Sequence, residues 1–302
     1  MLSLLFTSFQ AGLMAIFAVP IAYIVVFQII AQNGISDKHM ICATLILVVW
    51  CVFPLFYMLI APIEHKIMLF NGSEDSMTFS SFGGFSLHRN YYGFYVGLSI
   101  ILLTFYDVLK KYRIVLYPLL LIGLILSESR SSIIATLVCV SLFYIKKNGL
   151  KLSRLFMLSI GVGIIIFLWY YFSQNFASRD ISSNSDRWEL YNGFFNIFWD
   201  NFFWGTGKSS LYFSSNYPEG SPAHNFILQT LADYGFFTSL IFFFFIGYNF
   251  FHGGIYSKTL WCYLLIIGLF QPYFTFGIPI SFTLITFLMI AGLYRKSIYG
   301  YN

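Results

Sequence analysis

The sequence has very little charge. Only 10% of its 302 residues are Asp, Glu, Lys or Arg, whereas 58% are hydrophobic and the mean hydropathy is +0.75. About a quarter of the residues of a soluble domain are charged. The shortage excludes an ordinary soluble domain, places the chain among membrane proteins, and leads us to expect no nucleic acid as a partner.

Cysteine is also scarce. Cys42, Cys51, Cys139 and Cys262 all lie inside apolar runs, so we interpret them as small buried hydrophobes and not as disulfides or metal ligands. The sequence has no zinc-binding H-E-x-x-H pattern, and its outer loops have no acid-x-acid pair of the kind that often holds a metal diphosphate. We therefore expect neither a metal nor a cofactor. No short cleavable signal sequence is evident at the start of the chain.

Long apolar runs dominate the chain. A transmembrane helix needs about 20 apolar residues, and fewer where neighbouring helices or a thinned bilayer help. The sequence predicts an all-α, polytopic membrane helix bundle with about nine transmembrane helices, forming a single integral membrane domain over residues 1–302. The predicted spans are 9–31, 40–62, 91–106, 114–128, 131–145, 155–173, 224–251, 259–272 and 278–294.

The basic residues divide between the two sides of this bundle. Most lie in alternate loops, which marks those loops as cytoplasmic. These residues are Lys38, Lys110, Lys111, Arg113, Lys146, Lys147, Lys151, Arg154, Lys258, Arg295 and Lys296. The remaining six of the 17 fall outside, where topology gives no reason for them, so they form a shortlist of functional cations. They are Lys66, Arg89, Arg130, Arg179, Arg187 and Lys208, of which we interpret Lys66 and Arg179 as solvated loop charges.

Two outer loops are long, at residues 63–90 and 174–223. The second is rich in aromatic residues and contains "DRWELYNGFFNIFWDN", residues 186–201. We predict an amphipathic helix there that lies in the outer membrane interface, capped by Asp186 with Glu189 completing the pair. Its predicted apolar face consists of Trp188, Tyr191, Phe195, Phe198 and Phe202.

The segment "SESRSS", residues 127–132, is a turn between two short spans. The paths from Arg113 to Arg130 and from Arg130 to Lys146 each cover roughly 25 Å as helix, less than the ~30 Å hydrocarbon core. Arg130 should therefore lie near or beneath the outer face of the membrane, where an arginine is costly and usually functional. The alternative is a structural Arg130–Glu128 pair that reaches outward.

The segment "HNFILQTLADYG", residues 224–235, opens another span. Asn225, Gln229 and Asp233 fall within about 80° on one helix face, and we interpret them as a structural polar stripe that hydrogen-bonds to neighbouring helices. His224 stands at the aqueous boundary, where a neutral imidazole can accept a proton. A lone histidine there is more often structural than a base, and both interpretations stay open at this point.

Three other segments carry polar groups outside. Arg187 opens the predicted interfacial helix, where it is either an exposed charge or a bidentate phosphate ligand. Arg89 and Asn90, in "LHRN", stand at the outer mouth of a span and are candidates for substrate binding, with loop decoration as the alternative. "WGTGKS", residues 204–209, does not fit the spacing of a nucleotide-binding loop, so we interpret it as a turn.

Taken in order, these segments resemble a known family. "GGFSLHRNYYGFYV", "SESRSSIIA", "DRWELYNGFF…NFFWGTGKSSLY" and "HNFILQTLADYGFF" are similar to the ordered motifs of the bacterial O-antigen ligase and O-antigen polymerase superfamily. The similarity covers roughly residues 80–250. It implies a GT-C-like, metal-independent glycosyltransferase whose donor is a glycan on undecaprenyl diphosphate.

The resemblance also implies roles for single residues. Arg130 and Arg187 match arginines implicated in holding the diphosphate, and His224 matches the proposed base; Asn225 joins Arg89 and Asn90 as a candidate for substrate binding. The first interpretation is a polymerase of O-antigen or capsule repeat units, and the alternative is a ligase that transfers polymer to lipid A–core. A flippase or transporter is a further alternative, although the one-sided cations argue against it. The expected location is the bacterial inner membrane with the active site on the periplasmic side, where a chain-length regulator is a candidate partner.

Overall fold

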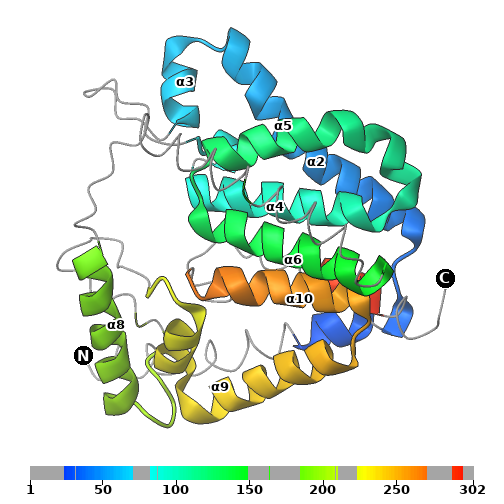
Figure 1. Cartoon of the computed structure of the whole chain (residues 1–302). Coiled ribbons are helices and arrows are strands. Elements are labelled where there is room, and N and C mark those ends of the chain that lie inside the picture. Colours follow the sequence, from blue (N-terminus) through cyan, green and yellow to red (C-terminus); the bar gives the residue numbers. More distant parts are fainter. Residues whose placement is uncertain are drawn as a thin grey trace, which may run out of the picture. The chain divides into compact units, whose positions relative to one another are not determined.

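All the regular elements of the described chain are helices. The computed structural model describes residues 24–30, 32–70, 82–86, 88–148, 163, 184–207, 209, 223–270 and 288–294 (Figure 1). The chain divides into two compact units, one formed by Ser36–Arg179 and the other by Met1–Ile35 with Asp180–Asn302. The predicted all-α class is confirmed, while a single membrane domain over 1–302 stays a prediction.

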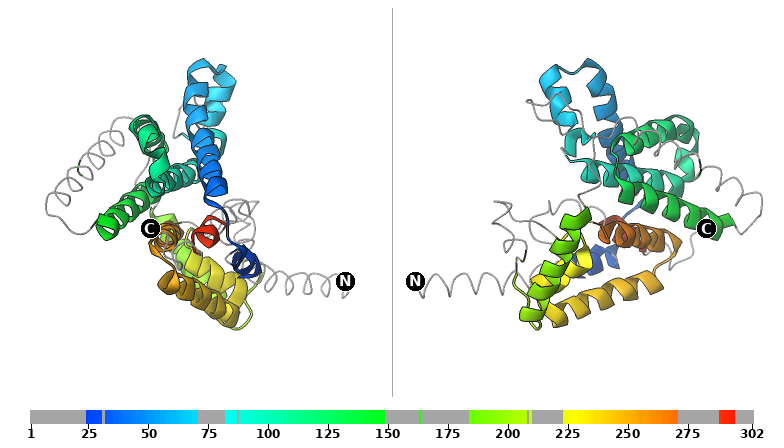
Figure 2. Two further views of the ribbon diagram at one scale, coloured as in Figure 1. Left: turned by 90° about the vertical axis from the view of Figure 1, so that its right-hand side faces the viewer. Right: turned by 60° about the vertical axis from the view of Figure 1, so that its left-hand side comes forward.

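The first unit is built around one buried helix. α4 (Arg89–Phe105) is buried at nearly every side chain from Tyr92 onward, and it packs against α2, α5 and α6 (Figures 1 and 2). Its apolar residues point in every direction, which suits a helix surrounded by others. The other elements are α2 (Asp37–Ile60), α3 (Ile63–Leu69), α5 (Arg113–Leu126), α6 (Arg130–Asn148) and the 3₁₀ turns η1 (Gly84–Ser86) and η2 (Asp107–Tyr112).

Tyr92 ties three elements of this unit together. Its ring is fully buried and packs edge-on against Phe82, and its hydroxyl donates to the backbone oxygen of Cys51 over 2.7 Å. Cys51 lies three residues before Pro54, where the proline interrupts the hydrogen-bond ladder of α2. Gly123 of α5 leaves the space that the Tyr92 hydroxyl occupies, because a Cβ there would come within 2.8 Å of it. α2, α4 and α5 are thereby held in register.

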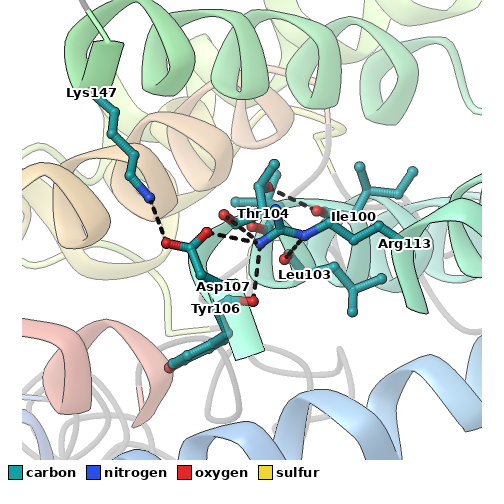
Figure 3. Close-up of polar contacts among 8 residues, drawn as sticks. Ile100, Leu103, Thr104, Tyr106, Asp107, Arg113 and Lys147 are labelled. Carbon is teal, nitrogen blue, oxygen red and sulfur yellow. Dashed lines mark hydrogen bonds and ion pairs between the residues drawn. The ribbon is translucent and has the colours of Figure 1, made fainter. Parts of the chain in front are cut away.

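A sharp bend separates α4 from η2 and α5, at an angle of 118°. Arg113 stabilises the bend, because its guanidinium donates to the last carbonyls of α4 (Figure 3). It also lies 3.6 Å from Asp107, which in turn lies 3.3 Å from Lys147 of α6. Arg113 is therefore a helix cap as well as a charge of the predicted cytoplasmic loop.

Seven of the described cations of the first unit fall into two groups. The end of the unit where α4 meets α5 carries Lys110, Lys111, Arg113, Lys146 and Lys147. Arg89 and Arg130 begin α4 and α6 at the opposite end. Within this unit, that separation agrees with the predicted topology.

The second unit packs α8 (Asn184–Asp200) and α10 (Ile255–Gly268) against α9 (Phe226–His252). α10 returns along α9, since Gly268 at its end lies against the ring of Phe226 at the start of α9. Phe27, from the helical residues 24–30, packs against an aromatic cluster with ring centroids 5.3 to 6.3 Å away. The cluster consists of Phe245, Trp261 and Tyr294.

The described helices contain fewer complete membrane spans than the sequence predicts. α2 and α9 are long and apolar enough to cross a membrane, and α4 with η2–α5 adds a third if that bent pair is one span. α5, α6 and α10 overlap predicted spans but do not pass the same test of length and hydropathy singly. The chain is a membrane protein, and the count of nine spans stays a prediction. The predicted spans 9–31, 155–173 and 278–294 fall mostly outside the described residues.

The cysteine prediction is partly wrong. All four are free thiols, and Cys51 and Cys139 are buried as expected. Cys42 is exposed on α2, on a face that an apolar helix presents to lipid rather than to protein.

Candidate active site

Two turns carry the leading candidates for catalysis and binding. We call residues 127–130 the Arg130 turn and residues 223–225 the His224 turn. The first lies in the first unit and precedes α6, and the second lies in the second unit and precedes α9. Each contains a non-glycine residue in the left-handed region, Glu128 and His224, both with φ of 51°. Such residues are uncommon and cluster at functional sites.

Serine hydroxyls stabilise the Arg130 turn. Ser127 Oγ donates to the backbone oxygen of Leu124 over 2.7 Å, and it accepts from the backbone N–H of Ser129 at 3.3 Å. Ser129 Oγ lies 2.9 Å from Ser132 Oγ, inside the first turn of α6. Both Ser127 and Ser129 face Gly93 of α4, where a Cβ would come within 2.6 Å of the Ser129 Cβ. The turn is thus fixed closely against the central helix.

Arg130 projects from this fixed turn. It is the first residue of α6 and its side chain is exposed. Glu128, which lies between α5 and α6, is half-buried, and burial raises the pKa of its carboxyl, while the positive charge of Arg130 acts in the opposite direction. The alternative of a Glu128–Arg130 interaction therefore has support, but it leaves the arginine exposed at the rim of the unit.

The predicted Arg89 and Asn90 lie at the same end of the first unit as Arg130. Both belong to the first turn of α4 and are half-buried. His88 caps the helix, because its Nδ1 accepts from the backbone N–H of Asn90 at 3.3 Å. Gly93, which contacts the Arg130 turn, lies one helical turn after Arg89. Arg89 and Arg130 therefore lie at the same end of the first unit.

The His224 turn caps α9. Asn225 Oδ1 accepts from the backbone N–H groups of Ile227 and Leu228 at 2.9 and 3.2 Å, and its Nδ2 donates to Leu269 at the end of α10 over 3.4 Å. α9 therefore begins at Phe226, and His224 lies before the helix and not in it as predicted. Asn225 acts as a helix cap, and its place among substrate-binding residues stays a prediction.

The predicted polar stripe exists in part, but its partner is different. Gln229 and Asp233 are 2% and 1% exposed, and the Gln229 amide donates to the Asp233 carboxylate over 3.0 and 3.1 Å. Both residues also bond to Ser209, which the sequence predicts to lie in a turn. Ser209 donates to Asp233 Oδ1 from its backbone N–H over 2.7 Å and from its hydroxyl. Gln229 and Asp233 therefore bind a returning loop segment, while Asn225 of the same stripe bonds to the end of α10.

That loop segment fills a break in α9. Gly235 has φ of 70° and ψ of −178°, a conformation that is essentially restricted to glycine. Residues 202–207, which we call the strap, lie along the break and bond to its backbone. Thr206 and Gly207 donate to the oxygens of Ala232 and Asp233, and Phe236 donates to Phe202, over 2.9, 2.8 and 2.7 Å. The glycines of the "WGTG" segment are the sequence signal that could have revealed this close approach.

Gly205 of the strap and Gly235 of α9 face each other. Gly205 also has a positive φ, of 67°, and a Cβ on it would overlap the backbone oxygen of Asp233. A Cβ on Gly235 would overlap the backbone oxygen of Phe203. Two glycines are therefore required where the chains meet backbone to backbone.

α8 is amphipathic, but two parts of its prediction are wrong. The helix begins at Asn184, so Asp186 lies inside its first turn and not before it as a capping residue would. Its buried face consists of Phe194, Ile197 and Phe198, and packs with Ala223 and Ala232. Of the five residues in the predicted apolar face, Trp188 and Phe195 are exposed, as a side turned to the membrane interface would be, but Phe198 is buried, so the five do not form one face. The helix thus has one apolar face against α9 and a separate exposed aromatic face.

Arg187 lies in the first turn of α8. It precedes Phe194 by two helical turns, about 10 Å along the axis. Because Phe194 belongs to the same cluster as Ala223, α8 passes beside the His224 turn. The second unit therefore contains Arg187, His224, Gln229 and Asp233, while the first contains Arg89 and Arg130. In the described part of the chain, no cluster of three His, Cys, Asp or Glu residues could hold a metal ion.

The comparison with protein families agrees with this set of residues. Residues 115–243 match the model of a family described as O-antigen ligase. The match begins in α5, ends in α9 and includes both turns and all of α8. No curated protein and no solved structure matches the chain. Members of the matched family are glycosyltransferase-like enzymes, and the match confirms, over residues 115–243, the resemblance of the motifs to the O-antigen ligase and O-antigen polymerase superfamily.

Proposed function

We propose that this protein is a membrane glycosyltransferase that polymerises O-antigen or capsule repeat units carried on undecaprenyl diphosphate. One observation carries the proposal: the O-antigen ligase match contains Arg130, Arg187 and His224. The location that we propose is the bacterial inner membrane, with the reaction on its periplasmic side. The separation of cations to the two ends of the first unit supports this orientation.

The proposed chemistry requires only side chains of this protein. Arg130 and Arg187 hold the donor diphosphate, because a planar guanidinium can bind phosphate oxygens in pairs. They stabilise the negative charge that develops as the lipid diphosphate leaves the anomeric carbon. His224 accepts the proton of the acceptor hydroxyl as its oxygen forms the new glycosidic bond. Neither a metal nor ATP takes part in this scheme.

The exposed aromatic face of α8 supports a reaction at the membrane surface. Trp188, Phe195 and Trp199 are 68, 48 and 56% exposed, and Phe203 and Trp204 of the strap are exposed to a similar degree. Tryptophan and phenylalanine suit the boundary between lipid and water. We propose that α8 lies in the outer interface, so that Arg187 meets the diphosphate at the depth of the lipid headgroups.

Polymerase and ligase differ in the acceptor, and the experiment must vary it. Purified protein in liposomes is given a lipid-linked repeat unit, either alone or with lipid A–core. A polymerase forms long chains on the lipid carrier without lipid A–core, whereas a ligase forms product only with it. A flippase would move the lipid-linked unit across the bilayer and form no glycosidic bond in either case.

Variants of Arg130 test the enzyme class directly. Arg130→Ala should lower the rate of product formation by about 10²–10³-fold, the usual effect of removing a group that stabilises developing charge. Arg130→Lys keeps the charge but loses paired binding, so it should retain more activity than the alanine variant. Normal product from both variants would contradict the proposed enzyme class.

A further inference from the structure

A buried chain of hydrogen bonds leads from residue 209 to the His224 turn. Ser209 bonds to the Asp233 carboxylate, the carboxylate bonds to the Gln229 amide nitrogen, and the Gln229 amide oxygen accepts from the backbone N–H of Ala223 over 2.8 Å. Ala223 immediately precedes His224. Ser209, Gln229 and Asp233 are all buried, so none of them is placed to meet a sugar in water.

The directions of these bonds are mutually dependent. Every group that bonds to Asp233 in this chain of hydrogen bonds is a donor, which suits a carboxylate that only accepts. The Gln229 amide must then turn its nitrogen toward Asp233, which leaves its oxygen to accept from Ala223. The carboxylate of Asp233, which only accepts, therefore orients the Gln229 amide so that its oxygen faces the His224 turn.

We propose that Asp233, Gln229 and Ser209 are positioning residues that hold His224 in its left-handed conformation and so aim its imidazole. The inference rests on the proposed function, because His224 is a base only there. The left-handed conformation of a histidine costs roughly 1–2 kcal/mol. The Ala223–Gln229 bond fixes the residue before His224, and the Asn225 cap fixes the residue after it.

Asp233→Asn tests the bond directions with almost no change in shape. The amide nitrogen that it introduces would oppose the Gln229 nitrogen, two donors now 3.0 Å apart. The relief available is a rotation of the Gln229 amide, but that turns its nitrogen toward the Ala223 N–H. Either arrangement leaves two donors facing each other, and the disturbance reaches the His224 turn.

A second exchange should repair the first. In the double variant Gln229→Glu/Asp233→Asn, the carboxylate introduced at position 229 can accept both from the Ala223 N–H and from the amide nitrogen introduced at position 233. The amide oxygen at position 233 can then accept from Ser209. The double variant restores the donor–acceptor pairs to Ala223 and between positions 229 and 233, and moves the charge by one helical turn. It loses the bond of 2.9 Å that the Gln229 amide donates to Ser209 Oγ. Rescue of a single variant by a second change is the signature of a direct coupling.

The experiment compares wild type, both single variants and the double variant as full-length protein in liposomes. Two quantities are measured: the rate of polymer formation, and the rate at which diethyl pyrocarbonate modifies His224, followed by mass spectrometry. Asp233→Asn should lower kcat by about 10–100-fold, since a small misplacement of a reacting group has effects of that size. KM for the lipid-linked unit should stay within about 2-fold, and the double variant should recover both rates to within about 2-fold of wild type. Ser239→Ala is the matched control, because it removes a different buried hydrogen bond of α9, to Thr230.

Several results would overturn the proposal. One is an Asp233→Asn protein with the kcat and the His224 modification rate of wild type. Another is a folded double variant that stays as impaired as the single one. If Asp233→Asn does not fold, the double variant decides alone: recovery of folding and of His224 reactivity supports the coupling, and failure contradicts it. If the wild type forms no polymer, the proposed function fails, but the modification rates still test the coupling.

Discussion

The two candidate turns use the same backbone device with different supports. In each, a left-handed non-glycine residue stands two positions before the first residue of a helix, Glu128 before α6 and His224 before α9. The Arg130 turn is fixed by hydroxyls within five residues of one another. The His224 turn depends on Gln229 and, through it, on Ser209, which is 24 residues away from Asp233 in sequence.

The two kinds of support suit two different tasks: binding a phosphate by Arg130 and orienting the imidazole of His224. The Arg130 turn is closed by its own serines and rests on Gly93 of α4, and it presents an exposed arginine, which is sufficient for a charge that attracts phosphate. In the proposed function His224 is a general base, which must point in one direction. By our inference that direction depends on residues that meet only when the second unit is folded. The predictions below disturb one support at a time.

The largest effect is expected from His224→Asn. Asparagine tolerates the left-handed region, so the turn should keep its shape, but the amide cannot accept the hydroxyl proton. The rate of polymer formation should fall by about 10²–10⁴-fold, the usual contribution of a general base. Thermal unfolding should be unchanged. An active His224→Asn enzyme would remove the histidine from the mechanism.

Gly235→Ala should disrupt the packing of the strap against the break in α9. The new Cβ would overlap the Phe203 oxygen in a backbone conformation that only glycine adopts readily, so we expect a loss of roughly 3 kcal/mol or more. Gly247→Ala is the control in the same helix, since nothing lies within 4 Å of its added Cβ. That change should stabilise α9 by about 0.5–1 kcal/mol. The thermal unfolding midpoints of the two variants must move in opposite directions.

Gly93→Ala applies a similar change to the Arg130 turn. A Cβ would press on Ser129 at 2.6 Å and on the Ser127 hydroxyl at 2.8 Å. Because a local turn and side chains can shift, the cost should be about 1–3 kcal/mol, less than at Gly235. Unfolding measured in detergent compares the two glycines. If Gly93→Ala lowered the free energy of unfolding more than Gly235→Ala does, the Arg130 turn would be the less tolerant of the two sites, contrary to our expectation.

The smallest effect is a pH dependence at Glu128. Burial raises the pKa of its carboxyl above the ordinary 4.5, so the folded state disfavours the ionised form more than the unfolded chain does. The group costs no stability below pH 4.5 and lowers stability as the pH rises through its raised value. Glu128→Gln should therefore be more stable than wild type at about pH 7 and equal to it below the ordinary pKa. A wild type that gains stability over Glu128→Gln with rising pH would contradict the sign.

Local patterns were sufficient to predict most of the described helices. Each of the apolar runs at residues 40–62, 91–106, 114–128, 131–145, 224–251 and 259–272 overlaps a described helix, because hydropathy and helix length are properties of contiguous residues. The polarity of Gln229 and Asp233 also marked them correctly as buried hydrogen-bonding groups. Their partner was missed, because Ser209 is distant in sequence and stands in a segment with no periodicity.

The errors at α8 and α9 have a common cause. Trp188 and Phe195 repeat at helical spacing, yet the face that packs on α9 contains Phe194 and Ile197. With aromatic residues on both faces, periodicity alone cannot tell a protein-facing side from a lipid-facing one. Likewise, hydropathy does not register the break at Gly235, since a single glycine inside an apolar run leaves the average unchanged.

The break in α9 also constrains how the protein is inserted. Interrupting a helix leaves carbonyls that lipid cannot satisfy, and here the oxygens of Ala232 and Asp233 accept from strap residues Thr206 and Gly207. The ribosome makes the strap before it makes α9, so these donors are already present when the helix leaves the translocon. A chain whose strap was moved after α9 would have to enter the bilayer with these two carbonyls unsatisfied, which is costly in lipid.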